Sequence, residues 1–163
     1  MTGSGKTEVY VRLAEAVRAR GRRVLLLVPE IALTPELVRR FRARFGDQVA
    51  ALHSGMSPGE RHDQQQLVAA GQRRIVIGPR SALLAPMRDL GVIVVDECHD
   101  ASFKQNSGLR YHAPDLALVR AKAVAAVCLL GSATPGCGRA WARPAVARSR
   151  SGTRSTSRPH DSR

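Results

Sequence analysis

The sequence predicts an α/β domain in which a parallel sheet carries helices on both faces. Short runs of consecutive apolar residues, too short to be helices, alternate along the chain with segments whose apolar residues recur at helical spacing. Such runs are typical of strands that are buried on both faces of a parallel sheet. Repeated strand–helix–strand order implies parallel pairing with right-handed crossovers, so ligands are expected beyond the carboxyl ends of the strands.

The chain opens with a predicted helix over residues 6–20. Its apolar residues at helical spacing are Val9, Leu13, Ala16 and Val17. The apolar run at 24–28 follows as the first strand. The second helix is expected to begin at Pro35, with Thr34 as its N-cap, and to end at Gly46.

The alternation of strands and helices continues to residue 130. A capping box at Ser57 and Glu60, with Pro58 in the first helical position, starts the third helix. The remaining ranges are a strand at 49–53, the third helix from 58 to about 70, strands at 74–78 and 92–96, a helix through 116–123 and a strand at 127–130. This order of elements is that of a parallel sheet.

Length and composition favour one globular domain. The chain has 163 residues, of which 44% are hydrophobic. No apolar run approaches the length of a membrane-spanning helix, and the N-terminus lacks the charged and apolar regions of a signal peptide, so we expect a cytoplasmic protein without a membrane partner. Cys98, Cys128 and Cys137 are odd in number and form no C-x-x-C pair, which predicts free thiols and no zinc site.

The formal net charge of +13 indicates a polyanionic partner, but this charge is unevenly distributed. The segment from Arg139 to the end has seven arginines and one acid, Asp161, and almost no apolar residues after Val146. Such a composition cannot bury enough apolar surface to offset the entropy lost on ordering. We therefore expect a globular domain over residues 1–138 and a disordered basic tail over residues 139–163.

Residues 2–7, with the sequence T-G-S-G-K-T, match a phosphate-binding loop except for its first glycine. The candidate nucleotide-binding residues are Gly3, Ser4, Gly5, Lys6 and Thr7. Glycines let successive backbone N–H groups surround phosphate oxygens. Lys6 is placed to reach the β- and γ-phosphates, and the Thr7 hydroxyl is placed to coordinate Mg²⁺.

The sequence Asp96-Glu97-Cys98-His99 closes an apolar strand. A carboxylate at a strand tip beside a phosphate loop is where Mg²⁺ is held, which makes Asp96 the metal candidate. Its neighbour Glu97 is the candidate base that orients and deprotonates the attacking water. The structural alternative is that strands often end in acidic turn residues.

The segment from Gly131 to Pro135 ends the last predicted strand with the sequence G-S-A-T-P. The hydroxyls of Ser132 and Thr134 could bond His99 or approach the γ-phosphate. Taken alone, serine and threonine before a proline are also ordinary turn residues.

The phosphate loop, D-E-x-H and S-A-T sequences, each at a strand edge and in this order, resemble the first motor domain of superfamily 2 helicases. Further stretches resemble the primosomal replication-restart helicases, the PriA family: residues 2–10, 28–34, 53–55, 78–83 and 96–105. The resemblance covers residues 1 to about 135 and implies a RecA-like P-loop NTPase fold, incomplete here. It also implies ATP and Mg²⁺ as cofactors.

The resemblance implies roles for individual residues. Lys6, Glu97 and His99 would act in ATP hydrolysis, and His99 with Ser132 and Thr134 would couple hydrolysis to movement. The residues implied in DNA binding are Thr34, Arg80 and Ser81 on strand-edge loops, and Lys104, Arg110 and Tyr111 in a loop after the acidic motif.

The assignments to DNA binding have structural alternatives. Arg80 fits a solvated surface charge as well as a phosphate contact. Phe103 and Tyr111 fit loop anchors packed on the domain as well as rings that stack on bases. The family commonly has a second glutamate at the position of Cys98 and a tryptophan at that of Leu109, and the latter difference reduces the expected stacking surface.

The resemblance implies an ATP-dependent DNA helicase or translocase of replication restart, with single-stranded or forked DNA and other replication-restart proteins as partners. Such a helicase needs two motor domains, because the second supplies an arginine to the transition state. Only one motor domain fits in 163 residues, and the family's N-terminal DNA-binding region and zinc module are missing. We therefore expect a fragment that binds ATP weakly and hydrolyses it poorly.

Two other functions stay open at this point. A non-enzymatic basic protein would bind nucleic acid through the arginines of residues 139–163, with the motor motifs as relics. A different enzyme, such as a phosphotransferase, would use the same phosphate loop, but it explains neither D-E-x-H nor S-A-T.

Overall fold

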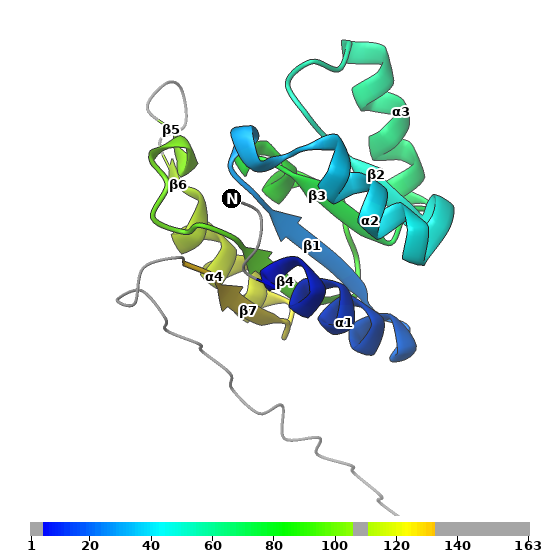
Figure 1. Ribbon diagram of the computed structural model, residues 1–163, viewed down its shortest axis with the longest axis horizontal. Coiled ribbons are helices and arrows are strands. Elements are labelled where there is room, and N and C mark those ends of the chain that lie inside the picture. Colours follow the sequence, from blue (N-terminus) through cyan, green and yellow to red (C-terminus); the bar gives the residue numbers. More distant parts are fainter. Residues whose placement is uncertain (1–4, 106–110, 133–163) are drawn as a thin grey trace, which may run out of the picture.

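The structure is a computed structural model that describes residues 5–105 and 111–132 (Figure 1). Five strands form one sheet in the order β2-β3-β1-β4-β7, and every pairing between neighbours is parallel. The strands are β1 (Arg23–Leu27), β2 (Val49–Ala51), β3 (Ile75–Gly78), β4 (Leu90–Val95) and β7 (Val127–Leu130). The prediction of a parallel sheet is confirmed.

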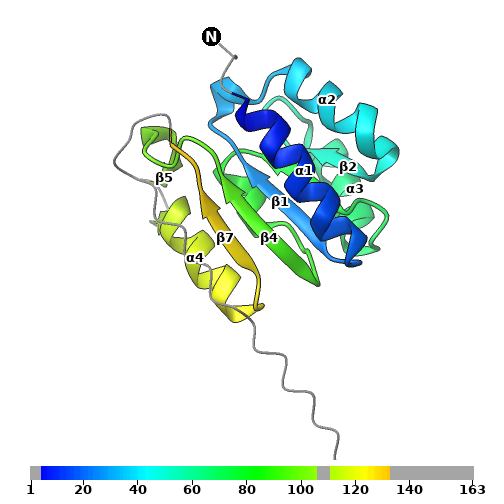
Figure 2. The same ribbon diagram turned by 60° about the horizontal axis from the view of Figure 1, so that its bottom comes forward.

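Four helices cover the two faces of this sheet. They are α1 (Lys6–Ala19), α2 (Pro35–Phe45), α3 (Pro58–Ala69) and α4 (Ala113–Ala123). Apolar residues of α1 and α2 form one buried cluster with one face of the sheet, and those of α3 and α4 form a second cluster with the opposite face. Figure 2 shows α1 and α2 over the same face. The predicted helices on both faces are therefore confirmed.

Some predicted features lie outside the described residues. They are the basic tail at 139–163 and the individual residues Gly3, Ser4, Arg110, Thr134 and Cys137. Their predicted roles stay predictions.

The strand β1 shows why the strands appear in the sequence as unbroken apolar runs. Val24 and Leu26 pack in the cluster formed with α1 and α2, whereas Leu25 and Leu27 pack in the cluster formed with α3 and α4. All four side chains are buried. A strand between two layers of helices has no face for polar residues.

The predicted starts of α2 and α3 are confirmed by their capping bonds. The Thr34 hydroxyl accepts a hydrogen bond from the backbone N–H of Leu37 at 3.3 Å. The Ser57 hydroxyl accepts from the N–H of Glu60 at 3.2 Å, and the Glu60 carboxylate accepts from the N–H of Ser57 at 2.8 Å. These bonds hold the pKa of Glu60 below its usual range. Local capping chemistry therefore fixes both helix starts.

The buried face of α1 differs from the predicted one. Tyr10 and Ala14 are its buried residues, while Val9 is 57% exposed. Tyr10, Ala14 and Val17 lie at the i, i+4 and i+7 spacing of one helix face. The prediction that Val9 belongs to the apolar face is wrong, because the tyrosine ring packs against the sheet in its place.

Short elements and the start of one strand also differ from the prediction. The strand β4 begins at Leu90, two residues before the predicted range. The short elements are a hairpin of β5 (Lys104–Gln105) and β6 (Tyr111–His112), and 3₁₀ helices at Glu30–Ala32, Gly46–Gln48, Arg80–Leu84 and Ala101–Phe103. Segments of two to five residues are too short to show a hydrophobic period.

The described ranges also bear on membrane-spanning helices and on the cysteines. None of the helices in these ranges combines the length and apolarity needed to cross a membrane. Cys98 and Cys128 are both buried. Burial raises the pKa of the Cys128 thiol to about 11, so this thiol stays protonated at neutral pH.

Replacing Phe41 should reveal how much the α2 side of the core contributes. Phe41 is 0% exposed and its ring stacks on that of Phe45, with centroids 6.0 Å apart. Phe41→Ala removes a fully buried ring and leaves a cavity, so we expect a loss of about 3–5 kcal/mol in the free energy of unfolding in a urea titration. Phe45→Ala should cost less because Phe45 is only partly buried. Equal losses would contradict this description of the core.

Candidate functional site

The candidate site lies where β1, β4 and β7 end. The backbone N–H of Asp96 donates to the Leu27 carbonyl at 2.8 Å, and that of Gly131 donates to the Val95 carbonyl at 2.7 Å. The N–H of Cys98 in turn donates to the Gly131 carbonyl at 2.9 Å. These bonds continue the parallel ladders past the strand ends, so the acidic sequence and the S-A-T sequence begin side by side.

The helix α1 brings Lys6 to this edge. It begins directly after Gly5, whose φ of 65° is in the left-handed region that favours glycine. The ammonium Nζ of Lys6 lies 3.4 Å from Oδ1 of Asp96 and forms an ion pair with Oε1 of Glu97. Lys6 and the two acids, which follow it by 90 and 91 positions in the chain, thus form one charge cluster.

The charges in this cluster favour the protonated form of Lys6. Partial burial alone would lower the pKa of Lys6, but the hydrogen bond to Glu97 and the negative charge of Asp96 raise it above its ordinary value. A fixed positive charge therefore offsets two adjacent carboxylates at this edge.

Tyr10 is a site residue that the sequence does not single out. Its hydroxyl donates a hydrogen bond to Oδ1 of Asp96 at 2.8 Å, and the residue is only 6% exposed. Burial and this bond to the carboxylate raise the pKa of Tyr10 well above its ordinary value, so the phenol stays protonated as a donor. One sequence feature could have identified Tyr10: it is a tyrosine on the helix that follows the phosphate loop, at a position that faces the sheet.

Glu97 has an unusual backbone conformation for a residue with a side chain. Its φ is 48°, in the left-handed region, and its carbonyl accepts a hydrogen bond from the N–H of Asp100 at 2.8 Å. This turn points Oε2 of Glu97 toward His99, whose Nε2 lies 3.8 Å away. Strained backbone of this kind persists where the surrounding structure fixes it, often at functional sites.

His99 connects the acidic sequence with the end of β7. Its Nδ1 lies 3.1 Å from the hydroxyl of Ser132, and its side chain is half exposed. The bond between a hydroxyl of the S-A-T sequence and His99, one of the options read from the sequence, is therefore present in the structure. Glu97, His99 and Ser132 form a continuous polar row along the edge.

The oxygen donors at this edge suit Mg²⁺. No cluster of three or more His, Cys, Asp or Glu side chains that could hold a metal occurs in the described ranges. Mg²⁺ does not need such a cluster, because it keeps several waters and binds one or two protein oxygens together with substrate phosphates. The Asp96 carboxylate is a hard oxygen ligand of that kind, and the Lys6 ammonium already lies beside it as a cation. The Thr7 hydroxyl, the second predicted ligand, belongs to a residue that lines the groove between α1 and α2.

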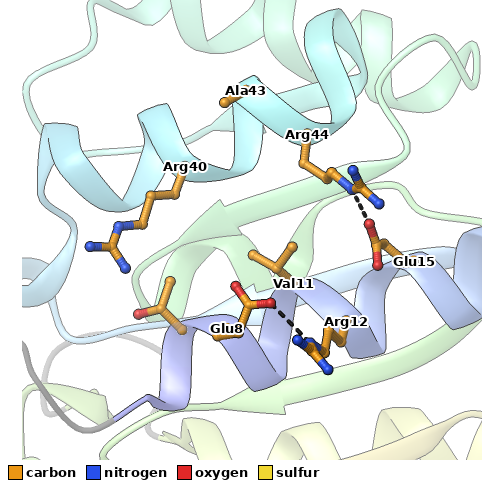
Figure 3. Close-up of a pocket in the computed structure, with 8 residues that line it drawn as sticks. Glu8, Val11, Arg12, Glu15, Arg40, Ala43 and Arg44 are labelled. Atoms are coloured by element: carbon orange, nitrogen blue, oxygen red, sulfur yellow. Dashed lines mark hydrogen bonds and ion pairs between the residues drawn. The ribbon is translucent and has the colours of Figure 1, made fainter.

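A groove of about 750 Å³ lies between α1 and α2 (Figure 3). Its lining includes Thr7 but not Lys6, Asp96 or Glu97. Its charges are largely paired, since Glu8 and Glu15 of α1 contact Arg12 and Arg44 respectively, while Arg40 contacts Glu36. We therefore place the candidate site at the sheet edge rather than in this groove.

Two of the residues predicted to bind DNA, Arg80 and Thr34, already have partners within the domain. Nη1 of Arg80 donates to the carbonyls of Ser102 and Lys104 at 2.8 and 2.7 Å. Arg80 is therefore not a free solvated charge, because it ties its 3₁₀ helix to the loop after the acidic sequence. The Thr34 hydroxyl caps α2, and Ser81 is exposed.

The aromatic residues of the loop after the acidic sequence are packed differently from one another. Phe103 is 0% exposed and belongs to the core, so it is a loop anchor. Tyr111 is half-buried against the same core, and Lys104 is exposed. In the β5–β6 hairpin Lys104 pairs with His112, which places the exposed lysine close to Tyr111.

Comparison with known proteins identifies the family to which the chain belongs. Residues 1–140 match the DEAD/DEAH box helicase family. The chain is 49% identical over 135 residues to replication restart protein PriA of Bacillus subtilis (strain 168), and this match covers 83% of the chain and 17% of that protein. It is 51% identical over 136 residues to the protein of the same name from Synechocystis sp., covering 83% of the chain and 16% of that protein. The predicted resemblance to replication-restart helicases is confirmed.

A solved helicase structure supports the fold. The crystal structure of the Pyrococcus furiosus Hef helicase domain matches with a TM-score of 0.59 and 28% identity, over 83% of this chain and 29% of that chain. The predicted motor-domain fold is thus confirmed. The chain spans 16–17% of the length of the two PriA relatives.

Substitution of Gly131 should test the close approach of α1 to this edge. A methyl at Gly131 would fall 2.4 Å from the Tyr10 hydroxyl and 3.2 Å from Oδ1 of Asp96. We expect Gly131→Ala to lower the free energy of unfolding by about 1–3 kcal/mol in chemical denaturation, because the methyl overpacks the site. Gly59→Ala, where a methyl meets nothing within 4 Å, should instead raise stability by up to about 1 kcal/mol. An unaltered stability of Gly131→Ala would refute this packing.

Proposed function

Because the chain belongs to the DEAD/DEAH box helicase family, we propose that it forms the ATP-binding motor domain of a replication-restart DNA helicase. The observation that supports this most strongly is the meeting of Lys6, Asp96 and Glu97 at the carboxyl edge of the sheet. A phosphate-loop lysine beside two acids, the second of which can act as a base, is the arrangement that phosphoryl transfer to water needs.

Each residue has a defined task in the proposed reaction. Lys6 leaves the carboxylates and contacts the β- and γ-phosphates, with the backbone of the phosphate loop around them. Asp96 and Thr7 would hold Mg²⁺, which, when bound, would offset the charge of the phosphates. Glu97, released from Lys6, orients the attacking water and accepts its proton.

The polar row beyond Glu97 offers a route from hydrolysis to movement. His99 lies within reach of both Glu97 and Ser132, so a change at the γ-phosphate that moves Glu97 also shifts the end of β7. Ser132 begins the segment that contains Thr134, the second hydroxyl of the proposed coupling pair. We assign coupling to this row because it joins two strand ends rather than side chains of one loop.

Three of the proposed DNA contacts, Arg80, Ser81 and Lys104, lie in segments that follow the carboxyl ends of β3 and β4. The exposed Ser81 and Lys104 are suited to phosphates, and Arg80 has donors left beyond the Nη1 atom that holds the loop carbonyls. Arg110 and Tyr111 would add a second phosphate contact and a base-stacking ring. In this function the partners are single-stranded or forked DNA and other replication-restart proteins.

Nucleotide binding can be tested at Lys6. Titration with a fluorescent ATP analogue should show weak binding by the full chain and a loss of affinity of at least about 10-fold in Lys6→Ala, because charge-assisted bonds to phosphate are lost. Lys122→Ala, an exposed lysine of α4, is the matched control and should leave the affinity unchanged. Equal affinities of Lys6→Ala and the parent chain would remove the phosphate loop from the site.

The rate at which this chain alone hydrolyses ATP needs a separate test. Arginines supplied by a second domain or protein accelerate related phosphoryl transfers by roughly 10³- to 10⁵-fold, and we propose that this chain lacks that contribution. Steady-state ATPase assays with and without single-stranded DNA should therefore show only slow turnover. Rapid turnover that DNA stimulates strongly would overturn this proposal.

The alternative, a non-enzymatic basic protein that binds nucleic acid, is favoured by the seven arginines among residues 139–163. Deletion of these residues separates the two functions. The alternative predicts that salt-sensitive DNA binding disappears with the deletion and does not respond to ATP. The helicase-domain function predicts that nucleotide binding survives the deletion, since the Lys6–Asp96–Glu97 cluster is untouched.

A further inference from the structure

The Tyr10 hydroxyl has no role in the reaction proposed above, although it contacts Asp96. It lies at the point where α1, the end of β4 and the end of β7 meet. Because a carboxylate only accepts hydrogen bonds, the phenol is the donor to Asp96. The ring is buried among the apolar residues that α1 shares with the sheet, so the hydroxyl has little freedom to move.

The Asp96 carboxylate is held through one of its two oxygens. In the described part of the chain, its donors all converge on Oδ1: the Tyr10 hydroxyl at 2.8 Å, the backbone N–H of Glu97 at 3.0 Å and Nζ of Lys6 at 3.4 Å. A carboxylate fixed at one oxygen presents the other in a defined direction. Oδ2 is the oxygen that this arrangement leaves for a metal ion or a metal-bound water.

The three donors differ in what happens to them when a nucleotide binds. Lys6 must turn toward the phosphates and gives up its contact with Asp96. The backbone N–H of Glu97 keeps its hydrogen bond to Oδ1 of Asp96, but this donor belongs to the adjacent residue, whose backbone is strained. Tyr10 is then the side chain that still fixes the rotation of the carboxylate.

Gly131 confines the hydroxyl of Tyr10 from the other side. A Cβ at this position would fall 2.4 Å from that hydroxyl, so the end of β7 is in direct contact with it. Ser132, the partner of His99, is the next residue along the chain. Movement at the start of the S-A-T sequence would therefore reach Asp96 through Tyr10.

We propose that Tyr10 is a positioning residue for the metal-binding carboxylate: its hydroxyl holds Oδ1 of Asp96 so that Oδ2 faces Mg²⁺, and Gly131 keeps the hydroxyl in place. This inference rests on the proposed function. Its readout is the effect of Mg²⁺ on nucleotide affinity, which differs from the test of the phosphate loop at Lys6.

The test compares affinity for a fluorescent ADP analogue in Mg²⁺ and in EDTA. The ratio of the two affinities measures the metal contribution in each variant. Tyr10→Phe keeps the ring and removes the hydroxyl, so this ratio should fall about 10-fold while the affinity in EDTA stays unchanged, as for loss of an outer-shell partner of a metal ligand. Val17→Ala, on the same face of α1, should lower stability without changing the ratio.

Two further variants make the result decisive. Asp96→Asn should lower the ratio, and Tyr10→Phe added to it should lower the ratio no further, because both act through one carboxylate. Gly131→Ala, which displaces the hydroxyl, should also lower the ratio even if Tyr10→Phe fails to fold. An unchanged ratio in Tyr10→Phe or Gly131→Ala, or an additional loss in the double variant, overturns the proposal. If the parent chain shows no nucleotide binding at all, the proposed function fails and this inference fails with it.

Discussion

The parallel hydrogen bonding of β4 between β1 and β7 is the constraint on which the described site depends. Because the three strands run in the same direction, their carboxyl ends share one edge, and the backbone bonds past those ends set Asp96 beside Gly131. The helix α1 packs across β1 and β4, and its N-terminus brings Lys6 to the same edge. The apolar clusters on both faces of the sheet hold β1, β4 and β7 in place. They thereby fix the position of the strand ends that carry the site residues.

The charge balance at this edge is consistent with both the observed ion pairs of Lys6 and the proposed binding of a nucleotide. Two adjacent carboxylates that are partly buried need a nearby cation, and Lys6 supplies it in the structure. In the proposed function, Lys6 would move to the phosphates and Mg²⁺ would lie beside Asp96. The carboxylates would then keep a cationic partner throughout, and the neutral donor Tyr10 would not take part in the exchange.

Much of the fold and part of the site could be predicted from the sequence, because the signals are local. Helix caps, apolar runs and the residues that follow them depend on neighbours within a few positions, and Thr34 and Ser57 behave as predicted. The contact of Tyr10 with Asp96 could not be predicted, because it depends on how α1 is rotated over the sheet and on the missing side chain of Gly131. Arg80 is a similar case, since its carbonyl partners follow it by more than twenty positions.

The most direct test of the proposed site is a crystal structure of the chain with Mg²⁺ and a non-hydrolysable ATP analogue. We expect Lys6 to contact the phosphates, the metal to lie beside Asp96 and Thr7, and the Tyr10 hydroxyl to keep its bond to Asp96. A nucleotide bound away from this edge, or a metal without contact to Asp96 either directly or through water, would contradict it.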